Sequence, residues 1–193
     1  MSPSRSHTDT RYRTIVADPP WPDVSRRMGK GGRRARSTEV PYLTMSYEAI
    51  ANLPVSELAE DAAALFLWST RRAFREGISV AVALAWGFEP VGEIIWGLRN
   101  LGMGGGALTA DHEPVLVATR GGLMLEPAVR GVGVHFWRQP YDRGKIHSAK
   151  PDGFLDLVER LSPSPRLEMF ARRQRLGWDT WGNEALEHVR IDA

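Results

Sequence analysis

Two kinds of segment alternate along the chain: short continuous apolar runs, and segments whose apolar residues have helical spacing. The runs are rich in β-branched and aromatic residues and end at proline, glycine or polar positions, a pattern typical of buried strands. Five of them predict strands, at residues 14–17, 63–68, 91–96, 113–119 and 166–171. The first run stops at two prolines, which cannot continue a central strand, so it is expected to end at the edge of a sheet.

Three helices are predicted between these strands, at residues 46–53, 72–86 and 151–161. Ser46 is placed to cap the first helix, and Gly87 to cap the second, whose apolar face is expected to continue across Gly77. Pro151 suits the first position of the third helix. Because strands alternate with helices, the sequence predicts an α/β fold with a mostly parallel central sheet, helices on both faces, and ligands beyond the carboxyl ends of the strands.

The remaining segments are predicted as loops. Residues 1–11 are polar and without pattern, so we expect a flexible N-terminus before a single domain over residues 12–193. Residues 98–110 and 120–145 are expected to be loops, the first because it is rich in glycine. A basic loop is predicted within residues 22–44, where six cations stand among glycines: Arg26, Arg27, Lys30, Arg33, Arg34 and Arg36.

Composition narrows the class of protein. With 42% hydrophobic and 25% charged residues, the chain is close to the globular average, which excludes collagen-like, coiled-coil and wholly disordered proteins. It has no cysteine, so disulfide frameworks, thiolate catalysis and sulfur-based metal sites are excluded. No apolar run is long enough for a membrane span, and the first residues lack the apolar stretch of a secretory signal. A cytoplasmic protein without a membrane partner is therefore expected.

The strongest candidate for chemistry is the tetrapeptide after the first strand: Asp18, Pro19, Pro20 and Trp21. A carboxylate and a carbonyl stiffened by proline can accept both hydrogens of an exocyclic amino group on a nucleobase, which orients the nitrogen lone pair toward an incoming methyl group. The aromatic ring can hold the base by stacking. The alternative is a strand-ending turn with a surface aspartate and a core tryptophan.

Five motifs, in order along the chain, resemble the MT-A70-like family of adenine methyltransferases. They are IVADPPW at residues 15–21, LFLWST at 65–70, HEPVLVATRG at 112–121, HSAKPDGFLDLVERL at 147–161, and RLEMFARR with GWDTWGNE at 166–173 and 177–184. The resemblance implies a Rossmann-like methyltransferase fold with permuted motif order, because the base-holding tetrapeptide precedes the cofactor segments. It also implies S-adenosylmethionine as cofactor and no metal, since that molecule carries its own activated methyl group.

The resemblance also implies roles for single residues. The tetrapeptide would hold the target adenine, and Asp18 would also contact the cofactor. Lys150 is similar to the family's cation for the cofactor carboxylate, although by itself it could be an ordinary solvated lysine. Four further positions match cofactor-binding positions of the family: Glu168, Arg172, Asn183 and Glu184. An amide beside a carboxylate suits vicinal ribose hydroxyls, whereas Glu168, an outlier in an apolar strand, could instead point to solvent.

Three further features have a structural and a functional interpretation. His112 and Glu113 are adjacent on a predicted strand and would point to opposite faces, so they are not expected to share a metal. Trp178 and Trp181 are expected to pack in the core rather than to contact a ligand. The basic loop directly follows the tetrapeptide, so its cations are expected to contact nucleic-acid phosphates, the alternative being a solvated stretch.

Together, the residues and the resemblance predict an S-adenosylmethionine-dependent adenine N6-methyltransferase of a bacterial or phage kind. DNA is favoured as the substrate because compact members of the family are commonly assigned to DNA. The same reaction on RNA, and a catalytically silent homologue that binds nucleic acid, stay open as alternatives. The sequence leaves open whether the chain forms a homo- or hetero-oligomer.

Overall fold

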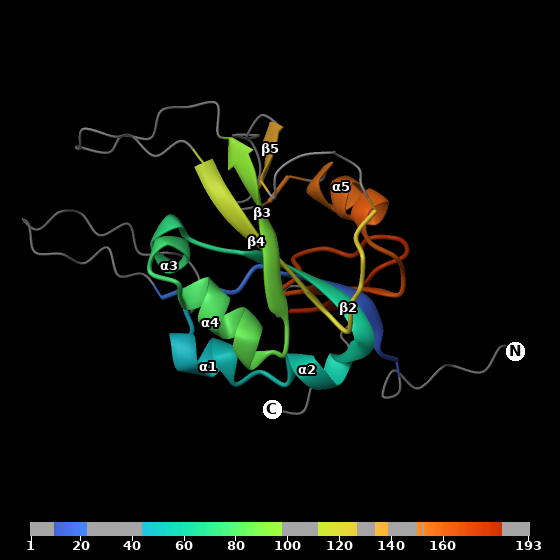
Figure 1. Cartoon of the computed structure of the whole chain (residues 1–193), viewed down its shortest axis with the longest axis horizontal. Helices are drawn as coiled ribbons and strands as arrows, with labels where there is room; N and C mark the ends of the chain where they lie inside the picture. The colour runs from blue at the N-terminus through green and yellow to red at the C-terminus, as the bar shows by residue number, and fades with distance from the viewer. Residues whose placement is uncertain are drawn as a thin grey trace, which may run out of the picture.

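One sheet of seven strands forms the centre of the molecule (Figure 1). The structure, a computed structural model, describes residues 10–22, 44–97, 112–126, 150–151, 153–182 and, for the backbone, 134–138. The strands are β1 (Tyr12–Ala17), β2 (Ala59–Trp68), β3 (Glu89–Gly97), β4 (His112–Arg120), β5 (Val134–Arg138), β6 (Arg166–Met169) and β7 (Asp179–Trp181).

The strand order is β5-β3-β4-β2-β1-β6-β7. Four neighbouring pairs are parallel, namely β1 with β2, β1 with β6, β3 with β5, and β6 with β7. Only the pairings of β4, with β2 and with β3, are antiparallel in the described sheet. This arrangement confirms the predicted mostly parallel α/β fold, and it brings β1 and β6, distant in sequence, side by side.

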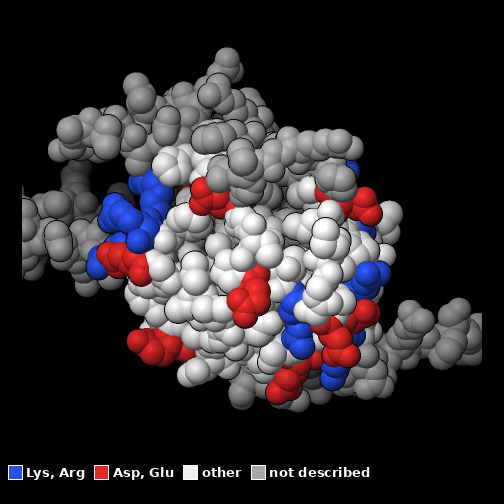
Figure 2. Space-filling model, in the orientation of Figure 1, with Lys and Arg blue, Asp and Glu red and all other residues white. Residues whose placement is uncertain are grey.

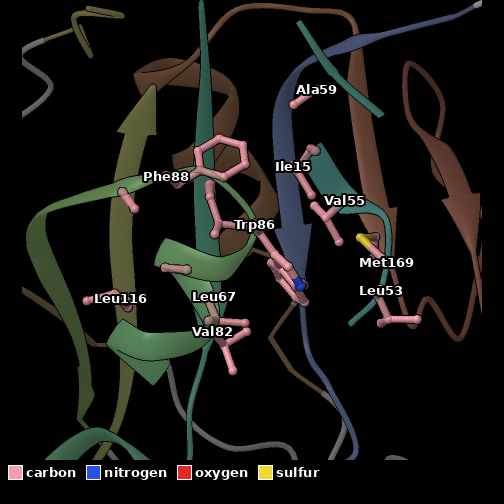
Figure 3. Packing of buried hydrophobic residues seen from close by; sticks show 14 of the residues in the cluster. Ile15, Leu53, Val55, Ala59, Leu67, Val82, Trp86, Phe88, Leu116 and Met169 are labelled. Carbon is pink, nitrogen blue, oxygen red and sulfur yellow. The ribbon is translucent and has the colours of Figure 1, made fainter. Parts of the chain in front are cut away.

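Helices cover both faces of the sheet, as predicted. They are α1 (Tyr47–Ala51), α2 (Val55–Leu58), α3 (Arg71–Arg75), α4 (Ile78–Ala85) and α5 (Gly153–Leu161). On one face, α1 and α4 pack in a cluster with β1 and β2, and the ring of Trp86 lies between α4 and β1 (Figure 3). On the other face, Phe154 of α5 packs against Phe66 and Trp68, with ring centroids 6.5 and 4.6 Å away.

Several helices and strands form where local sequence signals predict them. The Oγ of Ser46 accepts a hydrogen bond from the backbone N–H of Ala49 at 3.1 Å and so caps α1, as predicted. The strands predicted at residues 14–17, 63–68, 91–96 and 113–119 lie within β1 to β4. None of the helices in the described part of the chain has the length and apolar character to span a membrane.

Gly77 divides the helix predicted over residues 72–86. Its φ of 73° lies in the left-handed region, which glycine enters at little cost, so α3 ends before it and α4 begins directly after it. The prediction of one continuous helix is therefore wrong. Gly87, with a φ of 80°, does follow the end of α4 as expected.

The predicted loop over residues 120–145 is wrong where β5 forms and pairs in parallel with β3. The strand predicted to end at residue 171 stops at Met169, because Phe170 adopts a φ of 60° that breaks the extended backbone. The third helix begins at Gly153, two residues after the predicted start. The predictions for residues 1–9, 23–43 and 98–110 lie outside the described residues.

Candidate active site

Asp18 follows the last residue of β1, at the middle of the sheet. Ala17 pairs with Leu67 of β2 on one side and with Met169 of β6 on the other. Because these three strands are parallel, their carboxyl ends meet at one edge of the sheet, where open α/β folds bind ligands. The topology therefore places Asp18 between the residues that follow β2 and those that follow β6.

The Asp-Pro-Pro-Trp turn is fixed by three hydrogen bonds. The backbone N–H of Trp21 donates to the carbonyl of Pro19 at 2.8 Å, and that of Met45 donates to the carbonyl of Pro20 at 2.9 Å. The indole N–H of Trp21 donates to the backbone carbonyl of Trp68 at 2.9 Å. These bonds fix the conformation of the turn and attach it to the end of β2. The backbone that follows Asp18 is therefore held in place.

Trp21 is a core residue in this structure. Its side chain is 7% exposed and lies in the cluster that includes α1, with its ring centroid 6.1 Å from that of Tyr47. The alternative interpretation of a core tryptophan is therefore confirmed for Trp21. A buried ring offers a ligand little of its face. The expected stacking of the Trp21 ring on a base is not tested by this structure and stays a prediction.

Lys150 joins Asp18 to a second carboxylate, that of Glu113. Its ammonium nitrogen lies 3.3 Å from Oδ1 of Asp18 and 3.1 Å from Oε2 of Glu113, and 5.0 Å from the ring centroid of Trp68. Its side chain is only 22% exposed. The alternative of an ordinary solvated lysine is therefore wrong, and the structure brings Lys150 to the residue on which the predicted chemistry depends.

Burial and charge act in opposite directions on this cluster. Burial raises the pKa of Asp18, the Lys150 ammonium opposes that rise, and the negative charge of Glu113 adds to it. For Lys150, burial lowers the pKa, but the two carboxylates more than offset the effect and hold its pKa above the usual range. Lys150 is therefore charged, and the raised pKa of Asp18 makes its carboxyl a stronger hydrogen-bond acceptor than an exposed one.

Glu168 lies beside this cluster on β6, in register with Val16 of β1. Its Oε2 is buried and has no hydrogen-bond partner in the described part of the protein, so the alternative of a solvent-facing side chain is wrong. Burial, followed by the charge of Asp18, raises the pKa of Glu168 to about 7. A buried acceptor without a donor fits the hydroxyl groups that a nucleoside cofactor would bring.

The turn after β6 has a tight backbone. The left-handed φ of Phe170 is uncommon outside glycine, and such strain is often found where a ligand binds. Phe170 packs edge-on against Trp181, with ring centroids 5.0 Å apart. A Cβ on Gly182 would come within 2.6 Å of the backbone nitrogen of Ala171, so this position accepts only glycine without a shift of the backbone.

A cluster of polar contacts fastens the next segment to α5. Arg175 binds Glu159, with Nε 2.9 Å from Oε1, and Asp156, while the indole N–H of Trp178 donates to the same Oε1 at 2.8 Å. Trp178 is 7% exposed in the core on the α5 face. The prediction of core packing is therefore confirmed for Trp178, whereas Trp181 is partly buried and packs against the core cluster on the other face. The segment that carries Arg172 is held at both ends.

The structure does not test every residue named from the sequence. Arg172 is partly buried, and its charge contributes to the environment of Asp18, while its cofactor contact stays a prediction. Two predicted cofactor residues, Asn183 and Glu184, lie outside the described residues. So do the six cations of the basic loop: Arg26, Arg27, Lys30, Arg33, Arg34 and Arg36.

Sequence reasoning missed two features of this edge. The sequence presents Glu113 only as a neighbour of His112. Its contact with Lys150 follows from the antiparallel direction of β4, which brings the start of that strand to the carboxyl ends of β1 and β2. The second feature is α3, which follows β2 and exposes Arg71, Arg72 and Arg75. In Figure 2 blue side chains gather over α3 at one side of a mainly uncharged face. Among the described residues, no three acidic or histidine side chains are grouped to hold a metal.

Comparisons with known proteins agree with this geometry. The MT-A70 family model matches residues 12–184. The chain is 30% identical to the N6-methyladenosine RNA methyltransferase MTA1 of Pyricularia oryzae, a match that covers 91% of this chain and 47% of the relative. It is 29% identical to the Type II methyltransferase M.MunI of Mycoplasma sp, covering 90% of the chain and 78% of the relative. For human METTL3, an N(6)-adenosine-methyltransferase catalytic subunit, the identity is 30%, over 90% and 28%.

The chain thus spans less than half the length of two of these three relatives. The matched region nonetheless includes all the strands and helices of the described part of the chain, together with Asp18, Lys150 and Glu168. The chain belongs to the MT-A70 family, whose members are adenine methyltransferases that use S-adenosylmethionine.

Proposed function

We propose that this chain transfers a methyl group from S-adenosylmethionine to the N6-amino group of adenine in DNA. The observation that carries the proposal is the half-buried carboxylate of Asp18 at the carboxyl end of β1, which is held by Lys150 and followed by a hydrogen-bonded turn. Such a reaction needs an acceptor for the amino hydrogens, for which Asp18 is the candidate, and residues that bind a charged nucleoside cofactor.

An exocyclic amino group is a weak nucleophile because its lone pair is delocalised into the base. Asp18 accepts one amino hydrogen, and the carbonyl of Pro19 keeps a second lone pair free for the other, beyond the bond from Trp21. When bound, S-adenosylmethionine supplies an activated methyl group. The carbon–sulfur bond breaks as the carbon–nitrogen bond forms, and the nitrogen then loses a proton that Asp18 can accept and pass to water.

Two of the residues proposed to bind the cofactor, Lys150 and Glu168, lie near this carboxylate. Lys150 carries the positive charge that suits the cofactor carboxylate, and the unpartnered Oε2 of Glu168 suits a hydroxyl donor. Arg172, Asn183 and Glu184 are the further proposed contacts, on the strength of the family motifs. The reaction itself needs no metal in this proposal, because the leaving group is already charged.

Nucleic acid as the acceptor is supported by exposed arginines near the edge of the site. Arg71 and Arg75 of α3 are exposed, and α3 begins three residues after the end of β2. Phosphate contacts of this kind fix the register of a nucleic acid without selecting its sequence. The proposed basic loop would add to them, because it follows the tetrapeptide directly in the sequence.

DNA is proposed over RNA because compact members of this family are commonly assigned to DNA. Of the three relatives above, M.MunI is matched over the largest share of its length, whereas MTA1 carries RNA methyltransferase in its name. RNA is therefore the second candidate. A catalytically silent nucleic-acid-binding homologue is disfavoured, because the chain keeps the complete tetrapeptide together with the Lys150 that binds its aspartate.

The test measures the product directly. The purified chain is incubated with S-adenosylmethionine and adenine-containing DNA or RNA of the same base sequence, and the polymers are digested to nucleosides for mass spectrometry. N6-methyladenine in DNA, absent with an Asp18→Asn variant, supports the proposal. Methylation of RNA alone favours the second candidate, and cofactor binding without product on either polymer favours the silent homologue.

A further inference from the structure

Glu113 has no place in the chemistry proposed above, yet it contacts the same ammonium as the catalytic carboxylate. Its Oε2 lies 3.1 Å from Nζ of Lys150, and Oδ1 of Asp18 lies 3.3 Å from it. Its side chain is 37% exposed and comes from β4, whose first residues lie at the edge where β1 and β2 end. The ammonium of Lys150 thus forms ion pairs with two carboxylates.

One positive charge faces two acidic side chains in this cluster. Among the described residues, Lys150 is the cation that contacts both Asp18 and Glu113. Glu168 adds part of a further negative charge near neutral pH, and Arg172 contributes a positive one. The effect of Glu113 does not depend on the sum of these charges, because adding or removing one carboxylate changes the local potential in the same direction whatever the others contribute.

The proposed reaction changes the charge of its cofactor. S-adenosylmethionine has a sulfonium, whereas the product S-adenosylhomocysteine has a neutral thioether at the same position. The methyl group must reach a nitrogen held by Asp18, so this change of charge takes place next to the Asp18, Lys150 and Glu113 cluster. A group that attracts positive charge there stabilises the bound donor and not the bound product.

We infer that Glu113 makes the site prefer the sulfonium methyl donor over its neutral thioether product, and so favours release of the product after each transfer. The inference rests on the proposed function, since it assumes that S-adenosylmethionine is the donor. Glu113 is suited to this task because it shares Lys150 with Asp18 without being needed to hold the amino group. It is a specificity-determining residue that acts through the field at the site.

The test compares the affinities of the two compounds. Isothermal titration calorimetry measures the Kd of S-adenosylmethionine and of S-adenosylhomocysteine for the parent chain, for Glu113→Gln and for Glu89→Gln. Glu89 is exposed on β3, and it pairs with Thr119 at the far end of β4, so this control removes the same charge away from Lys150. For Glu113→Gln we expect the preference for the donor to fall about threefold to tenfold, the size of one charge screened at close range.

Two further measurements separate charge from structure. Glu113→Asp keeps the charge and should retain most of the preference for the donor, even if both affinities fall together. Added salt should reduce the difference in Kd between the parent and Glu113→Gln more for the sulfonium compound than for the thioether, because screening weakens the contribution of Glu113 itself. Comparing the two chains in this way cancels the contribution of the other charges at the site.

The outcomes distinguish the inference from the proposed function. An equal loss of affinity for both compounds in Glu113→Gln, or an unchanged ratio of their Kd values, overturns the inference and leaves the methyltransferase proposal standing. A difference between parent and Glu113→Gln that salt changes equally for both compounds also overturns it. If neither compound binds the parent chain, the proposed function itself fails, and the inference fails with it.

Discussion

Trp21 donates its indole N–H to the backbone carbonyl of Trp68, and this 2.9 Å bond fixes the turn after β1 to the end of β2. Trp21 belongs to the motif that contains Asp18, and Trp68 to the motif of the neighbouring strand, although 47 positions separate the two residues in the sequence. The tryptophan of the tetrapeptide thus has a mechanical role that is visible before any substrate is considered. It holds the backbone that positions Asp18, the proposed catalytic carboxylate.

Replacement of Trp21 by Phe should therefore affect both stability and turnover. The variant leaves a buried carbonyl without its donor, which costs about 1–3 kcal/mol of the free energy of unfolding. Turnover should fall as well, because the turn that positions Asp18 is loosened. Denaturant unfolding and methyl transfer at saturating cofactor measure the two effects.

Trp86 offers a matched control for this variant. Its indole N–H donates to the carbonyl of Ile50 at 3.1 Å, in the core between α1 and α4. Trp86→Phe should lose similar stability and keep its turnover per folded molecule. Equal losses of turnover in both variants would show that Trp21 acts through general stability alone.

Asp18→Asn should reduce turnover on the order of a hundredfold or more, the scale of losing one preorganised polar contact at the reacting group. The amide keeps the size of the side chain but presents a weaker acceptor for the amino hydrogen. Cofactor affinity should change far less than turnover. Single-turnover kinetics and calorimetry give the two quantities, and an asparagine variant with near-normal turnover would contradict the mechanism.

The basic loop should contribute to nucleic-acid binding through phosphates. Neutralising Arg33, Arg34 and Arg36 together should weaken binding to all sequences and reduce the slope of log affinity against log salt by up to about 2.7, or three phosphate contacts. S-adenosylmethionine affinity should stay at the parent value. Superimposable salt slopes for parent and triple variant would move the binding surface to other cations, with Arg71 and Arg75 of α3 the next to test.

The sequence predicted those elements whose own residues determine them. β1, with its apolar run and its proline stop, and α1, with its Ser46 cap, are local in this sense. β5 and β7 are short edge strands that form by pairing with β3 and β6, so the local pattern carries little of the information. The break at Gly77 depends on a backbone conformation that helical spacing alone does not predict.

The same distinction holds at the site. The tetrapeptide could be identified because its chemistry lies in four consecutive residues. Glu113 could not, because its contact with Lys150 requires the direction of β4, and that direction is set by pairing with two other strands. The burial of Glu168 was missed for a similar reason: its neighbours are β1 and the segment beyond β6, which only the assembled sheet brings together.

The contacts of Glu159 should stabilise the protein in a pH-dependent way. Burial raises the pKa of this carboxyl, but the bonds from Trp178 and Arg175 outweigh that effect and hold its pKa below the ordinary value. A carboxyl with a lowered folded pKa contributes stability above its unfolded pKa and loses it as pH falls through the folded value. Glu159→Gln should therefore reduce the free energy of unfolding by about 1–2 kcal/mol at pH 7 and by less in acid.

Unfolding by urea at several pH values tests this prediction. Glu159→Gln should also increase hydrogen exchange in the segment that follows β6, because Arg175 and Trp178 both lose the charged acceptor they share. An equal loss of stability at pH 7 and at pH 3.5 would mean that the ionised form of Glu159 contributes nothing.

Glu168 should have the opposite dependence. Its pKa is raised from 4.5 to about 7 by burial and then by the charge of Asp18, so the folded state binds a proton that the unfolded state releases between these values. Stability from this group is complete below about pH 4.5 and is lost as pH rises toward 7. Glu168→Gln, which cannot ionise, should be more stable than the parent above pH 7, by up to about 3 kcal/mol, and should lose that advantage near pH 4.

Glu89→Gln removes an exposed carboxylate and should show no such trend. If the difference between Glu168→Gln and parent is the same at pH 4 and pH 8, Glu168 is not the group that titrates. If Glu168→Gln binds S-adenosylmethionine less tightly than the parent and also unfolds at a higher urea concentration, then the buried carboxyl of Glu168 lowers stability but contributes to cofactor binding.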